Sequence, residues 1–289
     1  MRSSNPVLSR PDAWQVERAQ QAPGQYGPAG GQYGAYTQYP GNQYPGTQYP
    51  GQAPYGYDPN AQQFAPAPVA GRMTIDDVIT KSAITMGTLM LVAGLTFLFM
   101  PPALLGPAWI ISALVSFGVV LLVSFRRTVN PGFVLAYAAI EGVFIGAISK
   151  VYESMWNGIV PAAVLGTLVA AAATLAAYKF FRIKVTSKFR KMVMIGTIAY
   201  AGVLFVNFLL SIFGIGNMFA SANLGFLLLV SAFGVGLAVF NLILDFDYIE
   251  QGVAMGAASS ESWRAAFGLT VTMVWLYIEL LRLLSYFRR

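Results

Sequence analysis

Long apolar segments follow one another along the chain from about residue 83 to its end. Each is 18–23 residues long, close to the roughly 20 residues that a helix needs to cross a bilayer. None shows the alternation of apolar and polar residues that is typical of a membrane β-barrel strand. The pattern therefore predicts an all-α membrane protein, a seven-transmembrane-helix bundle with spans at about 83–100, 107–125, 132–152, 159–178, 192–213, 222–244 and 266–286.

Residues 1–72 have a different composition, rich in Gly, Pro, Gln and Tyr. Tyr39, Tyr44 and Tyr49 recur at intervals of five residues, and each is followed by Pro-Gly. A segment of this composition cannot bury a core, so we expect a disordered tail at 1–72 and a membrane domain at 73–289. The tail is either a flexible extension or a docking segment that uses its tyrosines.

Basic residues predict the topology. Arg126 and Arg127 follow the second span, and six more lie between the fourth and fifth, namely Lys179, Arg182, Lys184, Lys188, Arg190 and Lys191. Because cytoplasmic loops are enriched in Lys and Arg, we expect these connections and the N-terminal tail in the cytoplasm of a multi-pass plasma (cell) membrane protein. Seven spans place the C-terminus outside, whereas its terminal arginines favour the inside. The last segment therefore either spans fully, which we favour, or is re-entrant.

Composition excludes several kinds of chemistry. The chain is 56% hydrophobic and 10% charged, and it contains neither cysteine nor histidine. This excludes thiol chemistry, Ser-His-Asp catalysis, histidine zinc motifs and haem ligation by histidine. No GxGD motif or glycine-rich phosphate loop is present, so we expect no enzyme and no cofactor. The net charge of +6 reflects the basic loops of a membrane protein rather than nucleic-acid binding.

Acidic residues at a membrane span are the first candidates for function. The uncharged run 222–244 is followed by Asp245, Asp247 and Glu250. Ionisable groups at such positions are costly, and they are by default functional. Asp245 and Asp247 are close enough in sequence to titrate as a coupled set, and carboxylate oxygens are the ligands that calcium prefers. The alternative is a solvated helix end that faces lipid headgroups or Arg264.

Two further acids lie inside predicted spans. Glu141 lies ten residues into the third span, where it either bridges two helices in its neutral form or lines a pathway. Glu279 lies in the last span with Arg282 at i+3 on the same helix face, which favours either a local ion pair or an interior lining position. Gly142 and Gly146 form a small-residue pair that predicts close helix packing.

Three stretches resemble the Bax inhibitor-1 family, the YccA/YetJ-like membrane proteins, and more closely its actinobacterial branch. They are AIEGVFIGAI at 139–148, LDFDYIEQG at 244–252 and LYIELLRLLSYFRR at 276–289. The resemblance covers about 73–289, and it implies a seven-helix bundle whose last helix is surrounded by the others. It also implies a pH-sensitive calcium leak channel, in which an aspartate of the sixth helix pairs with one of the seventh and closes the pore on the cytoplasmic side.

The residues of that pair transfer only in part. Asp245 matches the aspartate of the sixth helix, because DFDYI resembles the corresponding family pattern. The aspartate of the seventh helix falls on Thr272 here, so either Asp247 or Glu279 could take its place, the latter paired with Glu141. The family's basic partner has no secure match, and Arg126 or Arg127 is our candidate.

Two functions follow as expectations. The first is a pH-modulated cation channel, for calcium, with Asp245 and Asp247 at the cytoplasmic gate and Glu141 and Glu279 lining the interior. The second is a non-transporting regulator that binds another membrane protein, such as a quality-control protease.

Overall fold

The computed structural model describes residues 71–126, 129–181 and 183–288. In these residues it contains seven α-helices and no strand, and all seven helices are long and apolar enough to cross a membrane. The fold class predicted from hydropathy is therefore confirmed. The helices are α2 (Ile75–Phe99), α3 (Pro102–Phe125), α4 (Pro131–Met155), α5 (Ile159–Phe180), α6 (Ser187–Ile212), α7 (Leu224–Ala254) and α8 (Glu261–Phe287).

Polar residues define where four of these helices begin. In each case an Asn or Thr side chain accepts a hydrogen bond from a backbone N–H of the first turn, which would otherwise lack a partner. The capping residues are Thr74 for α2, Asn130 for α4, Thr186 for α6 and Asn223 for α7.

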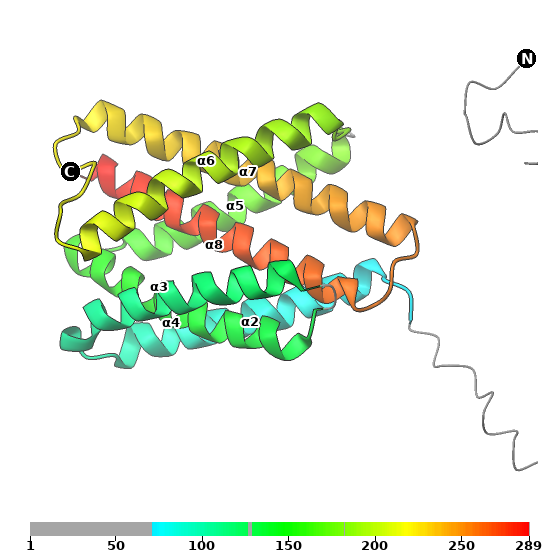
Figure 1. Cartoon of the computed structure of the whole chain (residues 1–289), viewed down its shortest axis with the longest axis horizontal. Helices are drawn as coiled ribbons and strands as arrows, with labels where there is room; N and C mark the ends of the chain where they lie inside the picture. The colour runs from blue at the N-terminus through cyan, green and yellow to red at the C-terminus, as the bar shows by residue number, and fades with distance from the viewer. Residues whose placement is uncertain (1–70, 127–128, 182, 289) are drawn as a thin grey trace, which may run out of the picture. The chain divides into compact units, whose positions relative to one another are not determined.

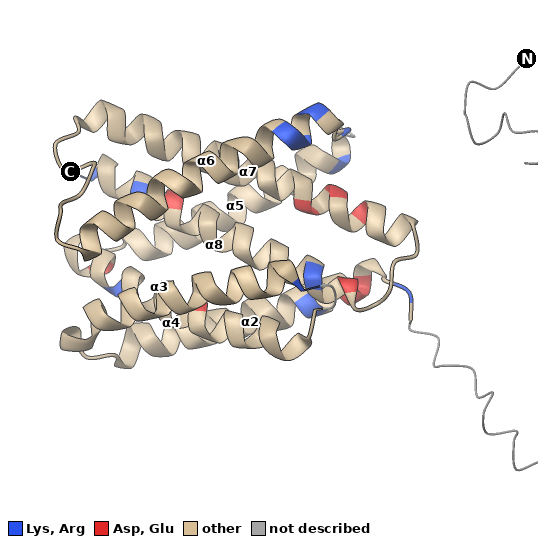
Figure 2. Cartoon of the chain, in the orientation of Figure 1, with Lys and Arg blue, Asp and Glu red and all other residues tan. Residues whose placement is uncertain are grey.

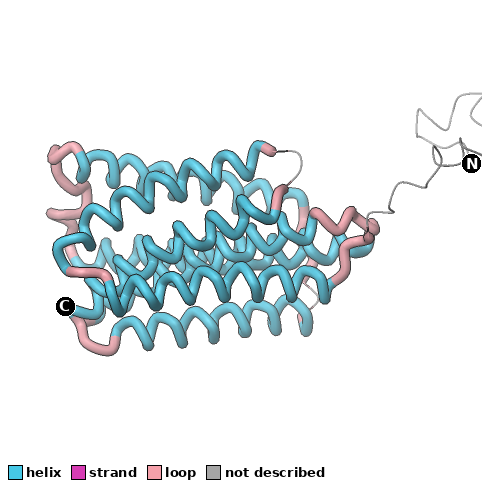
Figure 3. The backbone as a smooth tube through the Cα atoms, turned by 90° about the horizontal axis from the view of Figure 1, so that it is seen from below, coloured by secondary structure: helices cyan, strands magenta, loops and turns pink. Residues whose placement is uncertain are grey.

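Successive helices run in opposite directions, so the start of α2 and the end of α8 lie at opposite ends of the helical unit (Figures 1 and 3). The last segment is one unbroken helix of 27 residues. The structure therefore favours the full span that the sequence predicted, and not the re-entrant alternative.

The last helix lies among the others, as the resemblance implied. Four helices pack against α8, namely α2, α4, α5 and α7, and it passes through the middle of the unit in Figure 1. By contrast, the backbone of α6 comes close to that of α7 alone among the described helices, and its contacts with α3 and α8 are made by side chains such as Phe205 and Tyr200. Only 11% of the most apolar stretch of α6 is buried, against 44% for α8. Most of the α6 surface is therefore left for lipid.

The predicted small-residue pair holds α2 against α4. A Cβ added at Gly142 would lie 2.7 Å from the Leu89 carbonyl oxygen, and one added at Gly146 would lie 2.5 Å from that of Ala93. Both distances are shorter than real Cβ contacts. The two backbones can approach this closely only because glycine occupies both positions.

The predicted spans differ from the helices mainly at two ends. The first helix begins at Ile75 rather than near residue 83, because Thr74 caps a first turn that contains Asp76 and Asp77. The sixth span was expected to stop at residue 244, but α7 continues to Ala254. Its acidic residues have partners on neighbouring helices, so the helix does not end where the charges begin.

Basic residues gather at one end of the helical unit. The connections α3–α4 and α5–α6 and the start of α2 share this end, and Figure 2 shows Lys and Arg concentrated there together with the acids of α7. The charge pattern used to predict topology therefore corresponds to one face of the fold.

The predicted tail falls almost entirely on residues 1–70, which lie outside the described residues. Its last two residues are described, and they contact the α7–α8 connection. Arg72 pairs with Ala258, and the Ser259 N–H donates to the Gly71 carbonyl at 2.7 Å. These two residues are thus attached to the membrane domain.

Gly146→Ala should lower the thermal unfolding temperature in detergent, because its new methyl group would push α2 away from α4. Overpacking of this kind costs about 1–3 kcal/mol. The matched control is Gly87→Ala on α2, where an added Cβ meets nothing within 4 Å. If both variants unfold at the wild-type temperature, the close approach at Gly146 does not contribute to stability.

Candidate functional site

Asp245 and Thr272 face each other across the α7–α8 interface. The Thr272 hydroxyl donates a hydrogen bond to Asp245 Oδ2 at 2.6 Å. Gly268, one turn before Thr272 on α8, lies beside the carboxylate, and a Cβ there would make an ordinary contact of 3.5 Å with Asp245 Oδ1. The aspartate is thus held by a neutral hydroxyl rather than by a second acid.

This pair lines a cavity of about 400 Å³ between α3, α7 and α8. The cavity lies toward the end of the unit where basic residues gather, because its walls include the end of α3 and the first half of α8. Tyr248 and Arg264 also line it. The Tyr248 hydroxyl donates to Glu261 at 2.9 Å, and Arg264 forms an ion pair with Glu261 at 2.8 Å. The result is a hollow whose mainly apolar wall carries a few polar side chains and one membrane carboxylate.

Asp247 lies on another side of α7. Its Oδ2 accepts hydrogen bonds from Arg190 of α6 at 2.8 Å and from Gln251 at 2.7 Å. Residues two positions apart on a helix point in different directions, so Asp245 and Asp247 do not share a site. Glu250 faces α5 instead, where it accepts a hydrogen bond from the Tyr178 hydroxyl at 2.5 Å.

The structure therefore does not bring together the calcium ligands that we expected at Asp245 and Asp247. Among the described residues, no three or more acidic side chains form a group that could hold a metal ion. An ion at Asp245 would find one carboxylate and neighbouring neutral oxygens, which suits transient passage better than tight binding.

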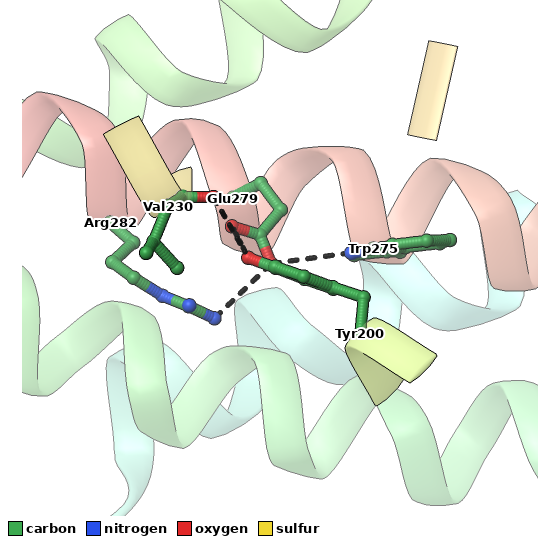
Figure 4. A network of polar contacts seen from close by, with 5 residues as sticks. All are labelled: Tyr200, Val230, Trp275, Glu279 and Arg282. Carbon is green, nitrogen blue, oxygen red and sulfur yellow. Dashed lines mark hydrogen bonds and ion pairs between the residues drawn. The ribbon is translucent and has the colours of Figure 1, made fainter. Parts of the chain in front are cut away.

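Glu279 is fully buried, with 0% of its surface exposed, and its carboxylate contacts three polar side chains (Figure 4). Trp275 donates to it at 3.2 Å, and Arg282 forms an ion pair with it at 3.2 Å. Tyr200 of α6 lies 3.0 Å from Glu279 and 3.3 Å from the Val230 carbonyl, so its one hydroxyl proton serves two acceptors. The predicted i,i+3 pair with Arg282 is present, inside a larger network that ties α6 to α8.

Glu141 is buried in α4, and the polar side chain beside its carboxyl group is Ser116 of α3. The partners of Glu279 come from α6 and α8 instead. The structure therefore gives no pairing of Glu141 with Glu279. Ser116 Oγ makes no hydrogen bond within the described residues, so both expected roles of Glu141, a bridge between two helices and a place on a pathway, stay predictions.

The basic partner that we sought also differs from the expected one. The Arg126 guanidinium lies over the Phe133 ring, 4.5 Å from its centroid. Arg127 lies outside the described residues. Arg264 is the basic side chain that lines the Asp245 cavity, and it also donates to the Arg126 carbonyl at 3.3 Å.

The family model described as Bax inhibitor 1 like matches residues 5–289. The chain belongs to the Bax inhibitor 1 like family. The match begins well before residue 73, so it covers more of the chain than the residues 73–289 to which the resemblance extended. A search of curated proteins gives no match.

In this Bax inhibitor 1 like protein, Thr272 takes the place of the second aspartate of the pair that the resemblance implied. The sequence resemblance placed the family's second aspartate at Thr272, and the structure places Thr272 directly against Asp245. The threonine thus occupies the position opposite Asp245 that the resemblance implied. Asp247 and Glu279 are both engaged elsewhere.

Sequence reasoning missed three side chains of these networks. Trp275 lies at i−4 from Glu279, a helical spacing that could have revealed it. Arg190 was counted only as a topology signal. Tyr200 is 79 positions from Glu279 in the chain. Gly234 on α7 makes room for that contact, because a Cβ there would lie 2.6 Å from Glu279 Oε2, but a glycine in the sequence does not identify either partner.

Arg282→Met should destabilise the protein by about 3–5 kcal/mol, since it leaves the buried Glu279 carboxylate without its ion-pair partner. Tyr200→Phe should lower the free energy of unfolding by less, about 1–3 kcal/mol, because Glu279 keeps two of its three donors. Unfolding in detergent, followed by circular dichroism, measures the free energy of unfolding of both variants. Arg288→Met is the control, because this exposed arginine donates only to a loop carbonyl, that of Asn157, at 2.6 Å. If Arg282→Met is no worse than this control, Glu279 does not depend on its arginine.

Proposed function

We propose that this Bax inhibitor 1 like protein is a pH-modulated cation leak channel of the cell membrane, with calcium as the expected ion. The observation that carries the proposal is the Asp245 carboxylate. It lies within a membrane helix, on the wall of a cavity of about 400 Å³, and its hydrogen-bond partner is the uncharged Thr272 hydroxyl.

Three other acids near this end of the bundle are matched by cations or tyrosines. Asp247 pairs with Arg190, Glu261 pairs with Arg264, and Glu250 accepts a hydrogen bond from Tyr178. Among the ion pairs of the described residues, none includes Asp245. A hydroxyl group can orient a carboxylate but cannot neutralise it, so a cation that enters the cavity gains favourable charge interaction there.

Dependence on pH follows from the same arrangement. A deprotonated Asp245 supplies a negative charge to the cavity, whereas a protonated one can keep its contact with Thr272 but offers no charge. Arg264, the cation that lines the cavity, is itself paired with Glu261. We therefore expect cation flux to fall as pH falls through the titration of Asp245.

We place the end of the bundle that carries this cavity, and the N-terminal tail with it, on the cytoplasmic side. The connections rich in Lys and Arg lie at that end, and such connections are retained in the cytoplasm. Glu279 and Glu141 then lie in the interior of the bundle, where Glu279 fixes α6 rather than contacting the ion.

Asp245→Asn should lower calcium flux into liposomes by about tenfold near neutral pH, because it removes an attraction worth at least about 1.4 kcal/mol. It should also make the remaining flux independent of pH. Asp247→Asn is the matched control, since the same change two residues away does not touch the cavity. Its Arg190 partner is half-exposed and can turn to water.

Loss of the pH step in Asp247→Asn, or its survival in Asp245→Asn, contradicts the assignment to Asp245. A wild-type chain that carries no calcium at any pH would favour the second function that we expected, a regulator that binds another membrane protein such as a quality-control protease.

Thr272→Asp should convert the single pH step of calcium flux into two steps. Two carboxyl groups at hydrogen-bond distance share a proton and titrate as a coupled pair. Thr272→Asn, which is similar in size but cannot ionise, should keep one step. Identical pH profiles for the two variants would show that residue 272 does not face the titrating group.

A further inference from the structure

A second hollow, of about 480 Å³, lies between α2, α4, α5 and α8. The backbones of α2 and α5 make no contact with each other in the described part of the chain, and this leaves a gap between them. Met90 and Leu98 of α2 and Leu168 of α5 form an exposed rim. Val274 and Tyr277 of α8 lie buried at the floor. The hollow thus opens sideways, toward the surface that faces lipid.

The hollow offers nothing to a polar ligand. None of its lining residues is charged. Its hydroxyl groups are already bonded: Ser149 and Tyr277 bond each other at 2.7 Å, and Thr167 and Thr270 donate to backbone carbonyls of their own helices. A buried water needs two to four polar partners, so water does not fill such a space.

An empty hollow of this size would also be unfavourable. Lining atoms without neighbours lose their dispersion contacts, and packed proteins contain few voids of such volume. The surrounding medium at this depth is the hydrocarbon of the bilayer. The volume of the hollow lies in the range of about 300–1,000 Å³ that is typical of ligand pockets.

We propose that this hollow is a binding site for one acyl chain of a bilayer lipid, which enters sideways between α2 and α5 and lies against α8. The occupant is an uncharged hydrocarbon chain, because the lining has no free polar group to recognise a headgroup. The site is separate from the proposed ion cavity. Thr270, Met273, Val274 and Tyr277 face the acyl chain, whereas Gly268 and Thr272 face the ion cavity from the opposite side of α8.

The test uses the full chain in phosphatidylcholine vesicles that contain a small fraction of lipid with a diazirine in the middle of one acyl chain. After illumination, labelled peptides are mapped by mass spectrometry. We expect labelling to concentrate on the hollow, at Thr167, Thr270 and Val274, well above the labelling of the exposed face of α6.

Gly94→Phe should reduce labelling of the hollow about fivefold or more, the equivalent of losing about 1 kcal/mol of binding. Gly94 lines the hollow, and a Cβ added there meets no neighbouring atom within 4 Å, so the backbone at this position has room for a side chain that occupies the hollow. Gly87→Phe is the matched control. It carries the same substitution on the same helix, also in open space, but outside the hollow.

Three outcomes would overturn the proposal. The first is labelling spread evenly over all lipid-facing helices. The second is that the hollow is labelled in Gly94→Phe as strongly as in the wild type, although Gly94→Phe and Gly87→Phe both unfold at the wild-type temperature. The third is covalent dimers formed by photo-methionine at Met90 or Met273, which would show that a second copy of the chain occupies the hollow.

Discussion

Carboxyl groups inside a bilayer must find their partners within the protein, and this constraint explains how the last three helices are arranged. Apolar contact alone does not hold a helix in place here, because lipid tails are as apolar as the helix surface. The contacts of α6 illustrate this. Its polar bonds follow one another along its length, from Arg190 with Asp247, through Thr197 with Asn241, to Tyr200 with Glu279. These bonds attach a helix that is otherwise mostly exposed.

The same constraint gives α8 its central role. It carries Glu279, whose network reaches α6, and Thr272, which contacts α7. Between Glu279 and Thr272, α8 separates two hollows of different chemistry: one has the charged side chains of Asp245 and Arg264 in its wall, and the other has no charged residue. Both hollows are next to the region of Thr270 to Thr272. A shift or rotation of α8 would therefore change both hollows together.

Hydropathy and local spacing predicted a good part of this structure. They predicted seven helices, the close approach at Gly146, and the pairing of Glu279 with Arg282, because each depends on neighbours along one helix or on length alone. They did not predict the end of α7. The charges after residue 244 suggested an end to the helix, but it continues because Asp247 is satisfied by Arg190 of another helix.

Contacts between helices distant in the chain could not be derived from the pattern. Tyr200 with Glu279 and Arg190 with Asp247 each join residues more than fifty positions apart, and neither has a periodic signal. Thr272 is the exception. Its position opposite Asp245 followed from the resemblance to a family, which carries information about pairing that a single chain does not.

A threonine opposite Asp245 changes how a titrating pair responds to protons. Two facing carboxyl groups share one proton, so their charge changes in two coupled steps. A carboxyl group that faces a hydroxyl changes in one step, and the hydroxyl can donate to the charged form or accept from the neutral form. The contact between α7 and α8 can therefore persist in both protonation states. In this chain, protons would act on the charge of the cavity, without first having to separate the two helices.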